Sequence, residues 1–116
     1  MHGLWAHSYA RPFVGAAQQQ LDVCLKALCH TFAVQRCGLV PIVEPELLIN
    51  GDHTMDKFAA ESERVILCCI QQLKQRQVCL EACLLKLQMI IPGVDCKAPK
   101  PSSEQIGQQT FDVMRR

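Results

Sequence analysis

The chain has 116 residues, 49% of them hydrophobic, which suits one small globular domain and excludes a chain disordered by composition. Its 12 lysines and arginines oppose 11 acidic residues, so a formal net charge of +1 creates no field that would gather nucleic acid or acidic lipid. The longest apolar runs are far shorter than the roughly 20 residues of a membrane-spanning helix, so we expect no membrane partner.

Residues 1–21 contain no acidic residue, as in a targeting peptide, but they hold no clear hydrophobic segment. We therefore expect a cytoplasmic protein, with a plastid location as the alternative. From Ala17 onward, apolar residues recur at helical spacing, which predicts an amphipathic helix ending near Gln35. Gly38 follows as its stop.

The segment Gly38–Val43 is apolar on both alternations and rich in β-branched residues, as in a strand buried on both faces of a parallel sheet. Pro41 fits this strand only at its entrance or where its nitrogen needs no partner. The turn residues 50–52 then precede apolar residues at helical spacing, which predicts a long helix over about 55–76.

Residues 78–86 return to strand character, and the prolines and glycine between 92 and 101 predict a loop. Ser102, three residues before Gln105, forms a capping-box pattern that opens a last helix. We expect one face of that helix to carry these residues: Ile106, Thr110, Val113 and Met114. Strands that alternate with helices predict an α/β fold built from right-handed parallel βαβ units.

Eight cysteines in a secreted chain would suggest a disulfide framework. Without a signal peptide we expect reduced thiols, because Cys68 and Cys69 lie inside a helical pattern, where cysteine packs as a small hydrophobe. No Cys-x-x-Cys step is present, so we predict no metal and no cofactor. A zinc site built from Cys79, Cys83 and Cys96 with His53 or His30 is the least favoured alternative.

Three chemistry-bearing residues follow the two predicted strands. Glu44 and Glu46 lie two residues apart at the end of the first strand, so their side chains leave the same face. Lys86 ends the second strand in the same sense. Because carboxyl ends of parallel strands lie at one rim, where α/β active sites are built, we expect the two acids and the lysine to converge.

Leucines at positions 84, 85 and 87 surround Lys86 and should partly desolvate it, which disfavours the ammonium form and frees the amine to attack a carbonyl. A neighbouring carboxylate opposes that effect, but it could carry the protons that carbinolamine formation and dehydration require. The alternative interpretation is structural: a lysine after a buried strand often extends to solvent, and Glu-Pro-Glu is often only a polar strand end.

Two segments of the sequence resemble known motifs. Gly38–Leu47, continued by Gly51-Asp52-His53, is similar to the strand signature of class I fructose-bisphosphate aldolases. Residues 80–93 resemble the segment that carries this family's Schiff-base lysine, and the spacing from Glu44 to Lys86 also matches. The likeness covers residues 25–116, whereas residues 1–24 match poorly.

The resemblance implies roles for the three residues. Lys86 would be the nucleophile toward the ketose, Glu44 the acid/base that handles the protons of cleavage and dehydration, and Glu46 its partner near the amine. The implied substrate is the sugar phosphate fructose 1,6-bisphosphate, which is cleaved to dihydroxyacetone phosphate and glyceraldehyde 3-phosphate in glycolysis without a metal.

The chain also departs from the family pattern. The family fold is a (β/α)8 TIM barrel of roughly 250 residues, and this chain would supply about three of its βα units. Trp5 lacks the lysine and arginine that flank the family's tryptophan, Leu87 replaces a proline, and Ile91 replaces a threonine. Ala82 and Cys83 replace a glycine-containing pair. We therefore expect a lyase-family fragment that is inactive as an isolated chain. The alternative is a non-catalytic interaction module that binds itself or a full-length aldolase.

Overall fold

A computed structural model describes residues 8–10 and 30–116, with side chains described from residue 30 onward. Residues 30–36 are helical, and a 3₁₀ turn covers Leu80–Ala82. The remaining elements, in chain order, are β1 (Ser8–Ala10), β2 (Ile42–Val43), β3 (Pro45–Leu47), α2 (Met55–Gln75), β4 (Leu84–Leu85) and α3 (Ser103–Arg115). The helix predicted from Ala17 and the comparison around Trp5 fall largely or wholly outside the described residues.

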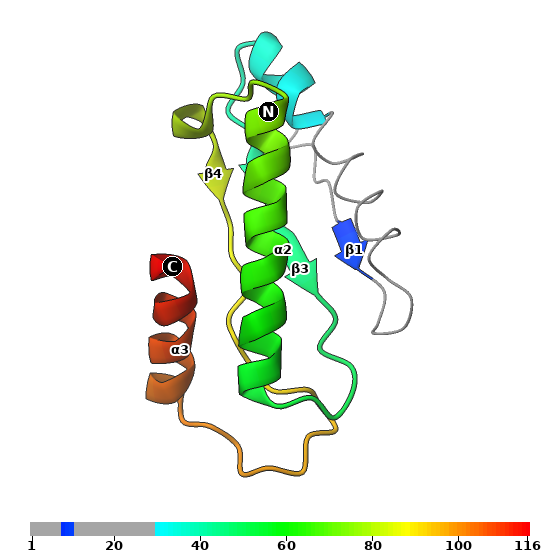
Figure 1. The fold of residues 1–116 in the computed structure, drawn as a ribbon, viewed down its shortest axis with the longest axis vertical. Helices are drawn as coiled ribbons and strands as arrows, with labels where there is room; N and C mark the ends of the chain where they lie inside the picture. The colour runs from blue at the N-terminus through cyan, green and yellow to red at the C-terminus, as the bar shows by residue number, and fades with distance from the viewer. Residues whose placement is uncertain (1–7, 11–29) are drawn as a thin grey trace.

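The strands pair in parallel, as the alternation of strands and helices predicts. Ile42 is the partner of Leu84 in the β2–β4 pair, and β1 pairs with β3 in the same sense. Two backbone bonds of 2.9 Å extend the β2–β4 ladder, from Leu84 N–H to the Pro41 carbonyl and from Lys86 N–H to the Val43 carbonyl. Since α2 lies between β3 and β4 along the chain (Figure 1), it is the crossover of a parallel βαβ unit.

The predicted strand Gly38–Val43 is corrected in both extent and burial. The ladder starts only at Ile42, because Gly38 has a φ of +74° that ends the preceding helix and the chain first has to turn. Pro41 lies at the strand entrance, where it needs no N–H. Leu39 and Val40 are each 61% exposed and Ile42 is 51% exposed, so burial on both faces is wrong. No element of the described chain covers their outer side.

The predicted strand over residues 78–86 is wrong for most of its length. Residues 80–82 form a 3₁₀ turn, in which Ala82 N–H donates to the Cys79 carbonyl and Cys83 N–H to the Leu80 carbonyl. Gln77, with a φ of +56°, reverses the chain just before this turn. Local hydrogen bonds therefore use the donors that a ladder would need, and pairing begins only at Leu84.

The long helix α2 is confirmed close to its predicted bounds. The Thr54 hydroxyl caps it by accepting from Lys57 N–H at 3.3 Å, while Asp56 in the first turn and Lys74 in the last complement the helix dipole. Its buried face follows the predicted periodicity and comprises Phe58, Ala59, Ser62, Val65, Cys69 and Leu73. In the described part of the chain no helix is long and apolar enough to cross a membrane.

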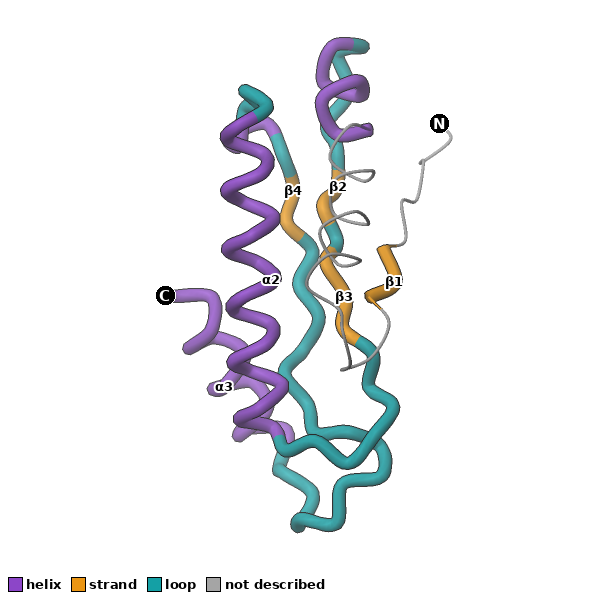
Figure 2. The backbone as a smooth tube through the Cα atoms, turned by 45° about the vertical axis from the view of Figure 1, so that its right-hand side comes forward, coloured by secondary structure: helices purple, strands orange, loops and turns teal. Residues whose placement is uncertain are grey.

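Helix α2 lies along one side of the strands, and α3 packs against α2 on the side away from them (Figure 2). One core cluster joins α2 to α3 and to the loop after β4 through Phe58, Ala59, Ile90 and Val113. A second cluster, Leu73 and Val78 packed against Val43, Leu80 and Cys83, ties the end of α2 to β2 and the 3₁₀ turn. The core therefore lies between α2 and the chain that carries the candidate site.

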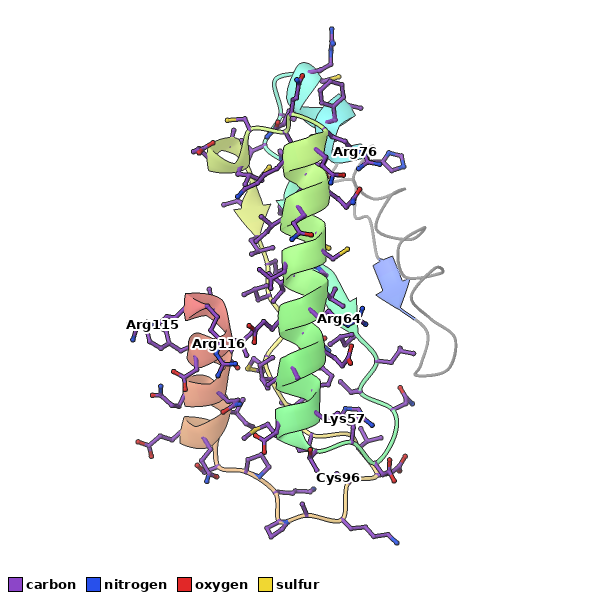
Figure 3. The ribbon with its side chains drawn as sticks, in the orientation of Figure 1. Lys57, Arg64, Arg76, Cys96, Arg115 and Arg116 are labelled. Carbon is purple, nitrogen blue, oxygen red and sulfur yellow. The ribbon has the colours of Figure 1, made fainter. Side chains whose placement is uncertain are left out.

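Helix α3 begins at the predicted capping box: Ser102 accepts from Gln105 N–H, and the Gln105 side chain accepts from Ser102 N–H. Val113 is buried, but Met114 is 60% exposed and does not belong to the packed face as predicted. Figure 3 shows Arg116 on the side of α3 toward α2, where it bonds Glu63 at 3.0 Å. Arg115 lies on the outer side, over the Phe111 ring.

Candidate active site

Lys86 and Glu44 meet at the carboxyl ends of neighbouring parallel strands. Lys86 follows β4 directly, and its backbone N–H donates to the carbonyl of Val43, the residue before Glu44. In this register the Lys86 Nζ lies 2.5 Å from a carboxylate oxygen of Glu44. Strand order and register therefore bring together two residues that are far apart in the sequence.

The two members of this ion pair differ in exposure. The Glu44 side chain is 11% exposed, whereas that of Lys86 is 56% exposed. Leu84 and Leu85 are 58% and 44% exposed, so they do not enclose the lysine. The expected desolvation of Lys86 is therefore wrong for this chain, because the leucines beside it are themselves in solvent. A pair with one end this exposed is screened and adds about 0–1 kcal/mol to stability.

Glu46 lies within β3, whereas the sequence pattern predicted that it follows the end of a strand. The extended chain does not end at Val43 but continues through β3 to Leu47, and Glu46 pairs there with Tyr9 of β1 in parallel register. It is partly buried. The reason for the difference is that residues 42–47 pair with β4 along their first half and with β1 along their second half.

Gln88 fixes the chain beyond Lys86, and sequence reasoning missed it. Its side-chain amide donates to the Leu47 carbonyl at 3.0 Å, and its amide oxygen accepts from Leu47 N–H at 2.8 Å. The side chain thus replaces the peptide group of a neighbouring strand and holds the Lys86 segment beside β3. No local pattern indicates this role, because its partner lies 41 positions away in the sequence.

Gln35 fixes the chain before β4 in a similar way. Its amide oxygen accepts from Cys79 N–H at 3.0 Å, and its amide nitrogen donates to the Cys79 and Ala82 carbonyls at 2.7 and 3.2 Å. A third contact joins the same nitrogen to the Cys83 sulfur at 3.1 Å. No local pattern announces this residue, because its partners lie 44 to 48 positions away.

The histidines and cysteines considered as metal ligands do not gather. Over residues 8–10 and 30–116, no group of three or more histidine, cysteine or acidic residues has the arrangement of a metal site. His53 is buried and stacks on Phe58, with 5.3 Å between ring centroids, while His30 lies on the helix 30–36. Six cysteines are described, and none of them is in a disulfide: Cys37, Cys68, Cys69, Cys79, Cys83 and Cys96.

The chain matches a family model over residues 17–116, that of the glycolytic class-I fructose-bisphosphate aldolases. It is 43% identical to a fructose-bisphosphate aldolase of Dictyostelium discoideum, over 75% of this chain and 26% of that protein. It is 45% identical to cytoplasmic isozyme 1 of Pisum sativum, over 75% of this chain and 24% of that protein.

A solved aldolase structure has the same fold over this region. The fructose-bisphosphate aldolase of Plasmodium falciparum, crystallised with TRAP and a small-molecule inhibitor, superposes with a TM-score of 0.82 and 30% identity. The match covers 88% of this chain and 29% of that one. This chain spans about a quarter of the length of the curated relatives it matches. On the strength of the family model and of these relatives, the chain belongs to the class-I fructose-bisphosphate aldolase family.

Proposed function

We propose that this chain carries the Schiff-base centre of a fructose-bisphosphate aldolase, with Lys86 as nucleophile, Glu44 as acid/base and Glu46 as its partner. The observation that supports this most directly is the Lys86–Glu44 contact of 2.5 Å at the ends of adjacent parallel strands. The reaction is the reversible cleavage of fructose 1,6-bisphosphate to dihydroxyacetone phosphate and glyceraldehyde 3-phosphate.

The chemistry requires an uncharged amine and a nearby proton carrier. Lys86 first gives up a proton, and the Glu44 carboxylate is in hydrogen-bond reach to accept it. The amine adds to the ketose carbonyl, and the returned proton lets the carbinolamine lose water to form an iminium ion. That cation withdraws electrons from the carbon–carbon bond that breaks. Glu46, two residues on from Glu44, assists the proton transfers.

The isolated chain supplies only part of this enzyme. We propose that it corresponds to about three of the eight βα units of a TIM barrel, a fold that takes roughly 250 residues, with residues 25–116 as the barrel portion. Phosphate-binding loops on the other units are then outside the chain. With the Lys86 side chain more than half exposed, the site is also open to water, whereas a closed active site expels it. We expect weak activity or none.

Borohydride trapping tests the nucleophile directly. The purified chain is incubated with dihydroxyacetone phosphate, reduced, and digested with trypsin, which does not cleave after a modified lysine. A Schiff base on Lys86 yields an adduct on a peptide running from Gln77 through to Lys97.

Lys74 on α2 and Lys97 in the loop are also exposed and serve as controls within the same chain, because they should stay unmodified. The variant Lys86→Arg keeps the positive charge beside Glu44 but cannot form an imine. An adduct on all lysines, or one that persists in Lys86→Arg, would remove the nucleophile assignment. Glu44→Gln should slow trapping while leaving the adduct at the same residue.

A second candidate function is a non-catalytic interaction module. It is favoured by the exposure of apolar side chains on β2 and β4, where Ile42 and Leu84 are 51% and 58% exposed. The partner would be a second copy of the chain or a full-length aldolase.

Several relatives are named as cytosolic or cytoplasmic isozymes, and we propose the cytoplasm for this chain.

A further inference from the structure

Two thiols flank the 3₁₀ turn that leads into β4. Cys79 precedes the turn and Cys83 follows it, and the Cys83 sulfur lies 3.3 Å from the Cys79 carbonyl oxygen. Because a carbonyl oxygen is about 2.4 Å from its own Cα by covalent geometry, the Cys83 sulfur lies within about 6 Å of the Cys79 Cα. Cys79 is exposed, so its thiol is accessible to a dissolved oxidant. A disulfide further requires the two Cα atoms to lie within about 7 Å of each other, and disulfide formation in the folded chain tests whether the turn meets this requirement.

The turn is held in this shape from outside. Gln35, on the helix 30–36, bonds the peptide groups of Cys79 and contacts the Cys83 sulfur. Figure 1 shows that helix and the turn at the same end of the molecule. The two thiols are therefore kept near each other by long-range contacts and not only by their closeness in sequence.

We propose that Cys79 and Cys83 form an oxidation site at which a peroxide closes an intrachain disulfide. The exposed Cys79 thiolate attacks one oxygen of the peroxide. The O–O bond breaks, so that Cys79 becomes a sulfenic acid and hydroxide leaves. The Cys83 thiolate then attacks the Cys79 sulfur, forms the S–S bond and expels a second hydroxide. The two thiol protons convert both hydroxides to water. Two electrons pass from the thiols to the peroxide, and this chemistry does not depend on the proposed lyase function.

Glu81 restrains the reaction. One of its carboxylate oxygens accepts a hydrogen bond from the Cys79 thiol, with 3.5 Å between the sulfur and the oxygen. Burial, and then the negative charges of Cys79 and Glu81, raise the pKa of the Cys83 thiol. Because only the thiolate attacks, oxidation should accelerate as pH rises and when the charge of Glu81 is removed.

Tryptic peptide mapping can follow the site without measuring activity. The reduced full-length chain is exposed to hydrogen peroxide, remaining thiols are alkylated, and the chain is digested. Cleavage after Arg76 and Lys86 releases a peptide, Gln77–Lys86, that holds both cysteines and no others. We expect this peptide to be unalkylated and lighter by two hydrogen atoms, in a yield that grows with peroxide exposure.

Matched variants separate the site from general thiol oxidation. Cys79→Ser and Cys83→Ser should each abolish the product, whereas Cys96→Ser should retain it, since Cys96 lies near the opposite end of α2 (Figure 3). Glu81→Gln should raise the initial rate severalfold, and Glu104→Gln, an exposed acid on α3, should leave it unchanged.

Three outcomes would overturn the proposal. One is Cys79 sulfinic acid with Cys83 still alkylated, and another is a disulfide from either residue to Cys37. The third is an equal rate of Cys79–Cys83 bond formation in the folded chain and in the same chain unfolded in urea, a comparison that needs no variant. Equal rates would mean that the folded turn does not create the site.

Discussion

Gly93 lies where the loop after β4 meets the loop after β3. Its N–H donates to the His53 carbonyl at 2.9 Å. A Cβ built there would overlap the Gly51 carbonyl oxygen and come within 3.0 Å of the His53 ring. The neighbour it would meet is backbone, which cannot swing aside as a flexible side chain can. Close approach of two backbones therefore requires glycine at this position.

The variant Gly93→Ala should lower the free energy of unfolding by about 1–3 kcal/mol, because the added methyl group forces the two loops apart. Gly107→Ala is the matched control: it lies in α3 with open space around it, and alanine there should stabilise by about 0.5–1 kcal/mol. Urea unfolding followed by circular dichroism measures both. A Gly93→Ala variant with unchanged stability would contradict the packing described for the two loops.

Gln88 makes a second residue-scale prediction. Gln88→Ala leaves the Leu47 N–H and carbonyl without the side-chain partners they have now, at a cost of about 1–3 kcal/mol for partly buried groups. Gln71→Ala, at an exposed position of α2, should change stability by less than about 0.5 kcal/mol. Thermal unfolding of the two variants side by side distinguishes the specific bonds from Gln88 to Leu47 from a general effect of replacing glutamine. A loss of stability in Gln71→Ala as large as that in Gln88→Ala would contradict the role given to Gln88.

At the scale of elements, the sequence predicts best what is decided locally. Helix α2 and the start of α3 follow from apolar spacing and from a cap within three residues of its partner. The strand expected over residues 78–86 failed because local turn bonds and Gln35, far away in the sequence, compete with the strand propensity of valine and leucine. Propensity weighs little against such contacts.

In the candidate site, too, some features could be predicted from the sequence and others depend on tertiary contacts. The meeting of Lys86 with Glu44 could be anticipated, because parallel strands bring their carboxyl ends to one edge whatever the details of the loops. The exposure of Lys86 could not, because it depends on which elements cover the strands and not on the leucines beside it. The roles of Gln35 and Gln88 also depend on tertiary contacts that have no local signature.

The capping box of α3 gives an element-scale prediction. Ser102→Ala removes the acceptor for Gln105 N–H and should cost about 0.5–2 kcal/mol. Because α3 contributes Val113 to the core and Thr110 to the Ile90 N–H, fraying its first turn should also loosen the loop after β4. Ser103→Ala, one residue on, is the control and should be nearly neutral. Hydrogen exchange at Ile90 amide reports the loosening, and equal protection in both variants would show that the cap acts only on α3.

At the scale of the whole molecule, α2 covers one side of the strand layer, and α3 packs against α2 (Figure 2). Ile42 and Leu84 are register partners, so they lie side by side on one face of the β2–β4 pair, and both are more than half exposed. Within the described ranges β4 has a single ladder neighbour, β2. An apolar face beside an open strand edge favours association with another chain.

We therefore expect the chain to self-associate in a concentration-dependent manner, which sedimentation velocity across a dilution series can measure. Leu84→Lys places a charge on the apolar face and should shift the distribution toward monomer, since burying an unpaired ammonium costs more than the leucine contact gains. Phe111→Lys is the matched control: Phe111 is 53% exposed on α3, away from the strands, so its replacement should leave association unchanged.

If both variants dissociate equally, association arises from general hydrophobicity. A wild-type chain that remains monomeric at every concentration would remove the β2–β4 face as an interaction surface, and adding full-length aldolase would then test the remaining partner.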